Sequence, residues 1–299
     1  MTEAAATGAA RLRGGAEGLA GGLPPLLAAA EQLAAAVQMG AHGRRRAGMG
    51  DEFWQYRPAH GGDAARAIDW RRSARSDAHY VREKEWQAAQ SVALWVDGAR
   101  SMDFTGGPDR PPKGERARLL ALALAVLLVR AGERVGLTAA GLPPRAGELQ
   151  LQRLAATLAA GGGGGDYGAP DAAMIPAHAR AVFISDFFGD PAATAAALTA
   201  AADRGVKGVL LQVLDPAEET FPYAGRTLFE SMAGGLRHET KKADSLRGRY
   251  LSRLSDRQAQ VAALARRAGW LFGRHVTGAP ALGALLWLYH GLDARGPAR

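Results

Sequence analysis

The sequence predicts an α/β fold in which a mostly parallel sheet carries helices on both faces. Three apolar runs each lead directly into an aspartate, namely Asp97, Asp186 and Asp215, and helical patterns separate these runs along the chain. A continuous apolar run is typical of a strand buried on both faces. Strands that alternate with helices favour parallel pairing through right-handed crossovers. At 299 residues the chain is long enough for one large or two ordinary domains.

The N-terminal part of the chain divides into stretches of different character. Residues 1–22 are rich in alanine and glycine, and we expect them to be disordered. Pro24 and Pro25 favour the start of a helix over residues 26–39. Residues 51–86 mix aromatic and charged side chains at irregular spacing, which predicts a structured loop or small subdomain held by arginine–carboxylate pairs and arginine–ring stacking.

From residue 87 the pattern becomes regular. The strand that ends at Asp97 is followed by a very apolar helix, 114–131, and then by a strand, a Pro/Gly turn and a second helix at 148–159. The later predicted elements are strand 181–187, helix 191–204, strand 208–214, an edge hairpin over 226–242, helix 243–268, strand 270–276 and a closing helix to 292. We therefore expect an N-terminal region at 23–86, an α/β domain at 87–292 and a tail at 293–299.

Composition limits the compartment and the chemistry. Apolar residues make up 47% and charged residues 22% of the chain, as in ordinary globular proteins. The absence of cysteine excludes disulfides and thiolate metal sites and is compatible with a reducing cytosol. No stretch resembles a signal peptide, and the apolar C-terminal run, residues 279–292, is too short to span a bilayer. We expect a cytoplasmic protein without a membrane span.

The net charge of +8 raises the question of an anionic partner. Only five of the 37 basic residues are lysine, so the charge reflects a composition rich in arginine, alanine and glycine. The pattern lacks a folded basic module with aromatic stacking platforms, so nucleic acid is not the expected partner. Nucleic-acid binding through Arg44–Arg46 and Arg71–Arg75 stays open as an alternative.

The strand end at Asp97 is the main candidate site. A carboxylate and a hydroxyl, Asp97 and Ser101, surround a turn of small residues at the position where open α/β sheets place ligand crevices. The five glycines at 161–165 lack the Lys-Ser/Thr ending of a phosphate-binding loop, so they predict a flexible loop. The sequence contains no credible catalytic triad.

The stretch from Asp97 to Ser101, together with Asp186, resembles the metal-ion-dependent adhesion site of von Willebrand factor type A domains. The resemblance implies a magnesium ion held by Asp97, Ser101 and Asp186. Ala99 stands at a hydroxyl position, however, and the glycine-rich loop offers Asp166 where the family has a threonine. Two outcomes are open: Asp166 replaces the missing hydroxyls, or the site is degenerate and Arg100 neutralises the two carboxylates. The second is favoured.

The segment before this strand resembles the bacterial family called domain of unknown function 58 (DUF58), over about residues 40–290. The resemblance rests on Glu52-Phe53, Arg57, Gly62-Asp63, Arg66, Ile68-Asp69-Trp70 and Ser73-Ala74-Arg75. It implies a three-layer von Willebrand A-like, Rossmann-like fold preceded by an Arg/Trp-rich segment. It also implies a partner rather than a substrate: a MoxR-type AAA+ ATPase and a client protein that is assembled or matured. The expected partner-binding residues are Arg57, Asp63, Arg66, Asp69, Trp70 and Arg75.

The leading hypothesis is therefore a non-enzymatic interaction protein. A magnesium-dependent phosphoester hydrolase is the alternative from another class, because clustered aspartates at strand ends can hold catalytic metals. The sequence offers no obvious general acid or base beside Asp97, Asp166 and Asp186.

Overall fold

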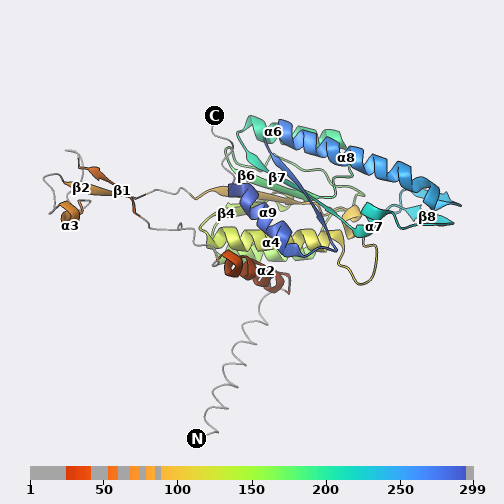
Figure 1. Cartoon of the computed structure of the whole chain (residues 1–299), viewed down its shortest axis with the longest axis horizontal. Coiled ribbons are helices and arrows are strands. Elements are labelled where there is room, and N and C mark those ends of the chain that lie inside the picture. Colours follow the sequence, from red (N-terminus) through yellow and green to blue (C-terminus); the bar gives the residue numbers. More distant parts are fainter. Residues whose placement is uncertain (1–24, 42–52, 60–67, 74–78, 85–88, 294–299) are drawn as a thin grey trace, which may run out of the picture. The chain divides into compact units, whose positions relative to one another are not determined.

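The computed structural model describes residues 25–41, 53–59, 68–73, 79–84 and 89–293, which belong to two compact units (Figure 1). The larger unit combines Met1–Gly40 with Gln90–Arg299, and the smaller unit is Ala41–Ala89. The sequence predicted a division near residue 87 but grouped the first helix with the Arg/Trp-rich segment. In the structure that helix belongs to the larger unit, because its apolar side enters the main hydrophobic core.

A six-stranded sheet in the order β10-β7-β6-β3-β4-β5 forms the centre of the larger unit. The strands are β3 Ser91–Val96, β4 Arg134–Leu137, β5 Leu142–Arg145, β6 Arg180–Ser185, β7 Lys207–Leu214 and β10 Leu271–Val276. Every neighbouring pair is parallel except β4 and β5. The predicted mostly parallel α/β sheet is confirmed.

The sequence predicted only a Pro/Gly turn after β4, but residues Leu142–Arg145 form strand β5 there. Its sequence contains Pro143 and Pro144, which cannot donate ladder hydrogen bonds and are tolerated because β5 pairs on one side only, at the edge of the sheet. Gly136 of β4 makes this pairing possible, since a Cβ atom there would lie 2.7 Å from the Leu142 carbonyl oxygen.

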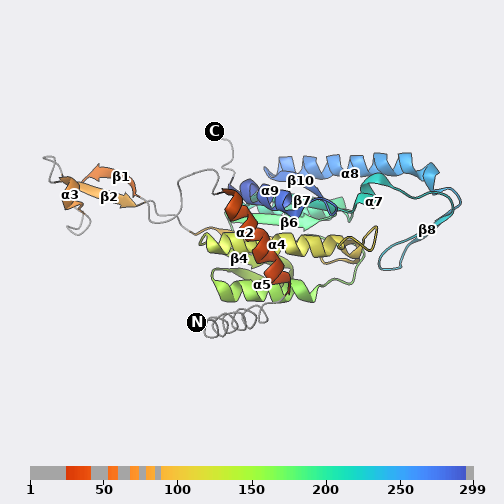
Figure 2. The ribbon, with the colours of Figure 1, turned by 60° about the horizontal axis from the view of Figure 1, so that its bottom comes forward.

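One face of the sheet is covered by α2 Pro25–Ala41, α4 Lys113–Arg130, α5 Glu148–Ala160 and α9 Ala281–Asp293 (Figure 2). Helix α2 buries Leu27, Ala30, Ala34 and Val37, which recur every three or four residues and so lie on one side of the helix. Beside this apolar side, Oε1 of Glu31 lies 3.3 Å from Nη2 of Arg130 in α4. The predicted helices 26–39, 114–131, 148–159 and 279–292 are confirmed to within two residues at each end.

The opposite face is covered by α6 Pro191–Asp203 and α8 Arg247–Arg267. Its core contains Trp95, Phe183 and Trp270, with ring centroids 5.8 Å apart for the first pair and 5.0 Å apart for the second. The Trp270 indole N–H donates to the Val206 carbonyl at 3.1 Å, so the buried polar group is satisfied. Helices on both faces complete the three-layer arrangement that the sequence predicted.

Short elements join the layers at the carboxyl ends of the strands. They are the 3₁₀ turns η2 Arg100–Asp103, η3 Thr138–Ala140 and η4 Ala243–Leu246, and the short helix α7 Pro216–Thr220. The sequence did not predict α7. The predicted hairpin is present as β8 Thr227–Glu230 and β9 Arg237–Thr240. It forms a separate two-stranded sheet, however, so its predicted place at the edge of the main sheet is wrong.

The smaller unit contains an antiparallel pair, β1 Phe53–Pro58 and β2 Tyr80–Lys84, with the short helix α3 Trp70–Ser73. The Ser73 hydroxyl is central to it, because it donates to the Asp69 carbonyl at 2.8 Å and accepts from the Tyr80 N–H at 2.9 Å. The Trp70 side chain is 56% exposed, and its ring centroid lies 5.4 Å from that of His79. A structured small subdomain is therefore present.

Among the described helices, none combines the length and the apolar character needed to cross a membrane.

Candidate functional site

The candidate site lies beside β3, at the point of the main sheet where the following strands are added first on one side and then on the other. After β3 the chain crosses to β4 on one side, whereas β6 pairs with β3 on the other side. The loops that follow β3 and β6 therefore diverge, and this is where open α/β sheets form their ligand crevices. Asp97 follows β3 directly, and Asp186 follows β6. The two strand-end carboxylates that the sequence singled out thus lie on neighbouring strands at the switch point.

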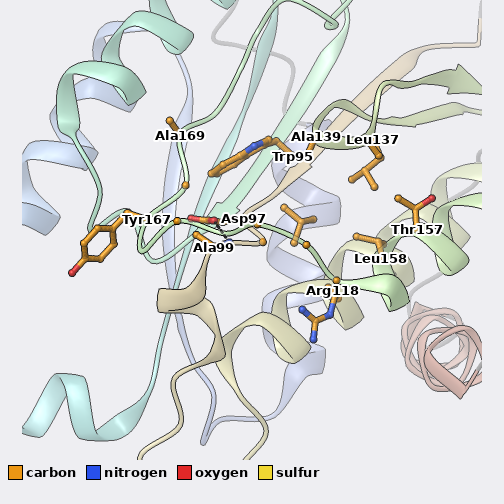
Figure 3. A pocket seen from close by; sticks show the side chains of 18 residues that line it. Trp95, Asp97, Ala99, Arg118, Leu137, Ala139, Thr157, Leu158, Tyr167 and Ala169 are labelled. Carbon is orange, nitrogen blue, oxygen red and sulfur yellow. Dashed lines mark hydrogen bonds between the residues drawn. The ribbon is translucent and has the colours of Figure 1, made fainter. Parts of the chain in front are cut away.

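Asp97 is buried and held by internal donors (Figure 3). One carboxylate oxygen, Oδ1, accepts from the Ala99 N–H at 2.9 Å, and Oδ2 accepts from the Ser185 hydroxyl at 2.7 Å. Burial raises the pKa of Asp97 above its ordinary value, although these hydrogen bonds act in the opposite direction. The side chain is only 2% exposed, so its contacts define the local structure of the turn after β3.

Asp186 pairs with a lysine that the sequence analysis did not single out. Lys113 Nζ lies 2.9 Å from Asp186 Oδ2 and 2.7 Å from Glu218 Oε1. The lysine and Asp186 side chains are each 1% exposed, so this is a buried ion cluster. Burial alone would lower the pKa of Lys113, but attraction to the two carboxylates raises it overall, and the ammonium stays charged.

Lys113 occupies the first position of α4, with its ammonium between the rings of Phe104 and Phe188 at 5.7 Å and 5.2 Å from the two centroids. A cation near a helix N-terminus is unfavourable to the helix dipole, so the two carboxylates must compensate for that cost as well as for burial. We call Lys113, Asp186 and Glu218 the ion triad. The sequence contained one weak signal for it: a lysine at the start of a helix that follows the strand ending in Asp97.

The remaining predicted ligands, Ser101 and Asp166, have different surroundings. The Ser101 hydroxyl is buried and has no hydrogen-bond partner among the described residues. Its backbone N–H donates to the Asp166 carbonyl at 2.9 Å. The Asp166 carboxylate instead accepts from the Ala233 N–H at 2.7 Å, and so it binds the turn of the β8–β9 hairpin.

The glycine-rich loop before β6 packs closely over Asp97. Gly163 has φ +104, and a Cβ atom there would lie 2.6 Å from the Gly98 carbonyl oxygen. At Gly168 a Cβ atom would come within 2.2 Å of Asp97 Oδ1. The Arg100 N–H donates to the Gly165 carbonyl at 2.9 Å. Gly163 and Gly168 therefore allow the loop to pack against Gly98 and the Asp97 carboxylate, and the flexibility expected from the sequence stays a prediction.

A cavity of ≈ 330 Å³ opens beside this loop. Figure 3 shows Asp97 and Ala99 at its centre, with Arg118 and Thr157 from neighbouring helices at its side and Tyr167 directed away from the carboxylate. Its lining combines glycines of the loop with alanines and with larger side chains such as Trp95, Leu137 and Leu158. It contains a carboxylate and a guanidinium, but the residues that line it include no cysteine, histidine or lysine.

These donors do not fit a resident magnesium ion well. Magnesium needs several oxygen ligands in near-octahedral geometry. Asp186 instead holds an ammonium, the Asp166 carboxylate binds the hairpin turn, and Ala99 has no oxygen in its side chain. Within the described ranges, no group of three His, Cys, Asp or Glu side chains is arranged to hold a metal. Magnesium binding at Asp97, Ser101 and Asp186 stays a prediction, and the geometry favours the degenerate alternative.

The neutralising cation is not the one that the sequence suggested. Arg100 is 57% exposed and lies nearest to Asp103, at 3.9 Å, so it does not pair with Asp97 or Asp186. Its position in η2 directs it to solvent, whereas the start of α4 faces the end of β6 and places Lys113 there instead.

The predicted partner-binding residues are only partly described. Asp69 and Trp70 lie at the start of α3, where Trp70 is exposed. Arg57 lies in β1. Asp63, Arg66 and Arg75 fall outside the described residues, as does the basic run Arg44–Arg46. Their role in partner binding stays a prediction.

A second polar contact joins α4 to the end of β10. Arg116 Nη1 lies 3.1 Å from His275 Nε2, and the same guanidinium donates to the Thr277 carbonyl at 3.1 Å and the Ala279 carbonyl at 2.8 Å. Burial, and then the charge of Arg116, lowers the pKa of His275 to about 4. His275 is therefore neutral near pH 7.

The chain is similar to a protein family of unknown function and to uncharacterized mycobacterial proteins. The family model described as "Protein of unknown function DUF58" matches residues 55–260. The uncharacterized proteins Rv1480 of Mycobacterium tuberculosis and Mb1516 of Mycobacterium bovis are each 29% identical over 236 residues, which is 74% of this chain and 73% of theirs.

Two solved structures are similar at low identity. A crystal structure of an aerotolerance-related membrane protein from Bacteroides fragilis, with multiple mutations to serines, is 15% identical with a TM-score of 0.41. The conserved hypothetical protein BatB from Bacteroides thetaiotaomicron is 14% identical with a TM-score of 0.37. Each similarity covers 68% of this chain and 97% of the other.

Substitution of the lysine tests the ion triad. We expect Lys113→Met to lower the free energy of unfolding by about 3 to 5 kcal/mol, because Asp186 and Glu218 would remain buried without their cation. The double variant Lys113→Met/Asp186→Asn should recover part of this loss, and Lys207→Met, at an exposed site, should change little. Urea unfolding measures all three. A loss below 1 kcal/mol in Lys113→Met would contradict the proposed importance of the triad.

The His275 contact predicts a pH dependence. Between pH 6.5 and about 4 an unfolded chain binds a proton at this histidine and the folded chain does not, so acidification destabilises the fold. In His275→Gln this contribution is absent, and the unfolding free energy should fall less between pH 7 and pH 4 than in the wild type. The exposed His290→Gln is the matched control and should follow the wild-type profile. Parallel pH profiles for wild type and His275→Gln would refute the assignment.

Proposed function

The chain belongs to the DUF58 family of proteins of unknown function, and we propose that it is a non-enzymatic interaction protein that acts with a MoxR-type AAA+ ATPase on a client protein. The choice of ATPase rests on the resemblance of the segment around Asp69 and Trp70 to proteins associated with such ATPases. The cytoplasmic location expected from the composition is part of the same proposal.

The observation that carries the proposal is the contact between Lys113 and Asp186 at 2.9 Å. A general base needs a carboxylate that can reach a substrate proton, and a metal-dependent hydrolase needs carboxylates free to bind the ion. Asp186 already binds an ammonium, and both oxygens of Asp97 accept hydrogen bonds from the protein. These contacts support a structural role for the strand-end carboxylates and a binding role for the surface around them.

Exposed aromatic side chains supply candidate contact points in each unit. Trp70 of the smaller unit is 56% exposed, and Tyr167, which follows Asp166 in the glycine loop, is 47% exposed. Tryptophan and tyrosine are enriched among the residues that contribute most to binding energy at protein interfaces. The loop before Tyr167 packs on the turn that follows β3, where the Ser101 N–H donates to the Asp166 carbonyl at 2.9 Å, so the ring is presented from a defined backbone.

Capture of a purified MoxR-type ATPase from the same organism tests the proposal. The tagged chain should retain the ATPase in the presence of ATP and magnesium, and Trp70→Ala and Tyr167→Ala should each reduce the retained amount about tenfold. Leu149→Ala, at a side chain 61% exposed on α5, is the matched control and should bind as the wild type does.

Unfolding midpoints establish that each variant is folded before binding is compared. Equal retention of the ATPase by the wild type and both aromatic variants would contradict the proposed surface. Turnover of a phosphoester that requires magnesium and is abolished in Asp97→Asn would contradict the non-enzymatic role.

A further inference from the structure

A second cavity lies away from Asp97, between the β8–β9 hairpin and the N-terminal half of α8. Its volume is ≈ 530 Å³, and it shares no lining residue with the Asp97 cavity. Aromatic side chains and two arginines characterise it, among them Phe221, Tyr223, Phe229, Tyr250, Arg249 and Arg253. We call it the aromatic groove. A cavity of several hundred Å³ that is mainly apolar and carries a few polar groups is typical of a ligand or peptide site.

The aromatic floor is organised around Phe221, the residue that directly follows α7. Its ring centroid lies 4.8 Å from that of Tyr250 and 5.6 Å from that of Phe229. Tyr223 in turn packs edge-on against Phe229 at 5.3 Å. Phe221 itself is buried and has φ +48, a conformation that is uncommon for an aromatic residue and that the surrounding packing must stabilise. The floor is therefore preformed, while Tyr223, Phe229 and Tyr250 remain partly exposed.

The rim of the groove is positively charged. Arg249 and Arg253 lie one turn apart on α8, both exposed, and neither forms an ion pair with any carboxylate in the described part of the chain. Glu218 is the acidic residue in the lining, and its carboxylate is already bound to Lys113 at 2.7 Å. The groove thus offers an apolar floor and two guanidinium groups without counterions, which complement an anionic ligand with an apolar side chain.

The neighbouring hairpin favours a protein over a nucleic acid as the ligand. It exposes Leu228, Met232 and Leu236 by 53%, 44% and 67%. Exposed apolar side chains gathered on one short segment are typical of protein–protein contact. The hairpin carboxylates Glu230 and Glu239 are ion-paired with Arg237 and Arg226, at 3.1 Å and 2.6 Å, so they do not oppose an acidic ligand.

We propose that the aromatic groove binds an acidic peptide segment of a partner protein. An apolar or aromatic side chain of the peptide packs on Phe221 and Tyr250, and its carboxylates pair with Arg249 and Arg253. This site uses neither Trp70 nor Tyr167, so it goes beyond the proposed function and can fail or succeed separately from it.

Fluorescence polarisation with a defined probe tests the proposal on the full chain. The probe is a fluorescein-labelled peptide of glutamate and aspartate around a central Leu-Trp pair. We expect it to bind about tenfold more tightly than a peptide with lysine at the acidic positions, or one with serine in place of Leu-Trp. The affinity should fall as salt is raised, because exposed charges are screened.

Charge reversal identifies the groove as the binding site. Arg249→Glu/Arg253→Glu should weaken probe binding about tenfold or more, whereas Arg266→Glu/Arg267→Glu, exposed at the other end of the same helix, should leave it unchanged. Tyr223→Ser should weaken binding without abolishing the fold, which an unfolding curve verifies. No binding of the acidic probe, equal loss in both double variants, or tighter binding of a single-stranded oligonucleotide at the same arginines would overturn the proposal.

Discussion

The ion triad is the interaction on which the carboxyl edge of the sheet depends. Lys113 reaches from the start of α4 to Asp186 at the end of β6 and to Glu218 in α7, so one ammonium joins three segments that are far apart in the sequence. A charge buried to this degree is stable only when opposite charges and hydrogen bonds replace its lost hydration. Removal of Lys113 therefore leaves two carboxylates without their cation, whereas removal of one carboxylate leaves a single ion pair.

The triad also reaches the aromatic groove, because Glu218 lines it. Glu218 accepts from Lys113 through Oε1 and from the Asp215 N–H through Oε2 at 2.9 Å, while Asp215 accepts from the Ala217 N–H at 2.7 Å. These bonds form the N-terminal cap of α7, and Phe221, the centre of the aromatic groove, directly follows this helix. Glu218, which shares the Lys113 ammonium with Asp186, thus also caps the short helix that precedes the groove floor.

The sequence predicted those features of the fold that a local pattern of residues encodes. Continuous apolar runs identified β3, β6 and β7, and their terminal aspartates identified the switch-point site, because both signals are local. The ion triad was not predictable in this way, since its members are separated by 73 and 105 residues. Arg100 was the wrong cation for the same reason: its nearness to Asp97 in sequence does not determine where its side chain points.

Two other differences between the predicted and the observed fold also arise where the sequence carries no local pattern. Strand β5 contains two prolines and therefore lacks a strand pattern, yet an edge position tolerates them. Helix α2 was predicted to belong with the segment that follows it. Its apolar side instead packs in the same hydrophobic core as α4, although 71 residues separate the two helices in the sequence. The sequence did not predict the aromatic groove either. Its lining comes from α7 and the residues after it, from the hairpin and from α8, and none of these segments contains a recognisable motif by itself.

Diffraction from wild-type crystals grown with manganese tests the central claim most directly, because the ion scatters anomalously and binds magnesium sites. The account predicts no anomalous peak at Asp97, Ser101 and Asp186, with the Lys113 ammonium within hydrogen-bond distance of Asp186. A manganese ion coordinated by these carboxylates, with Lys113 displaced from Asp186, would contradict it.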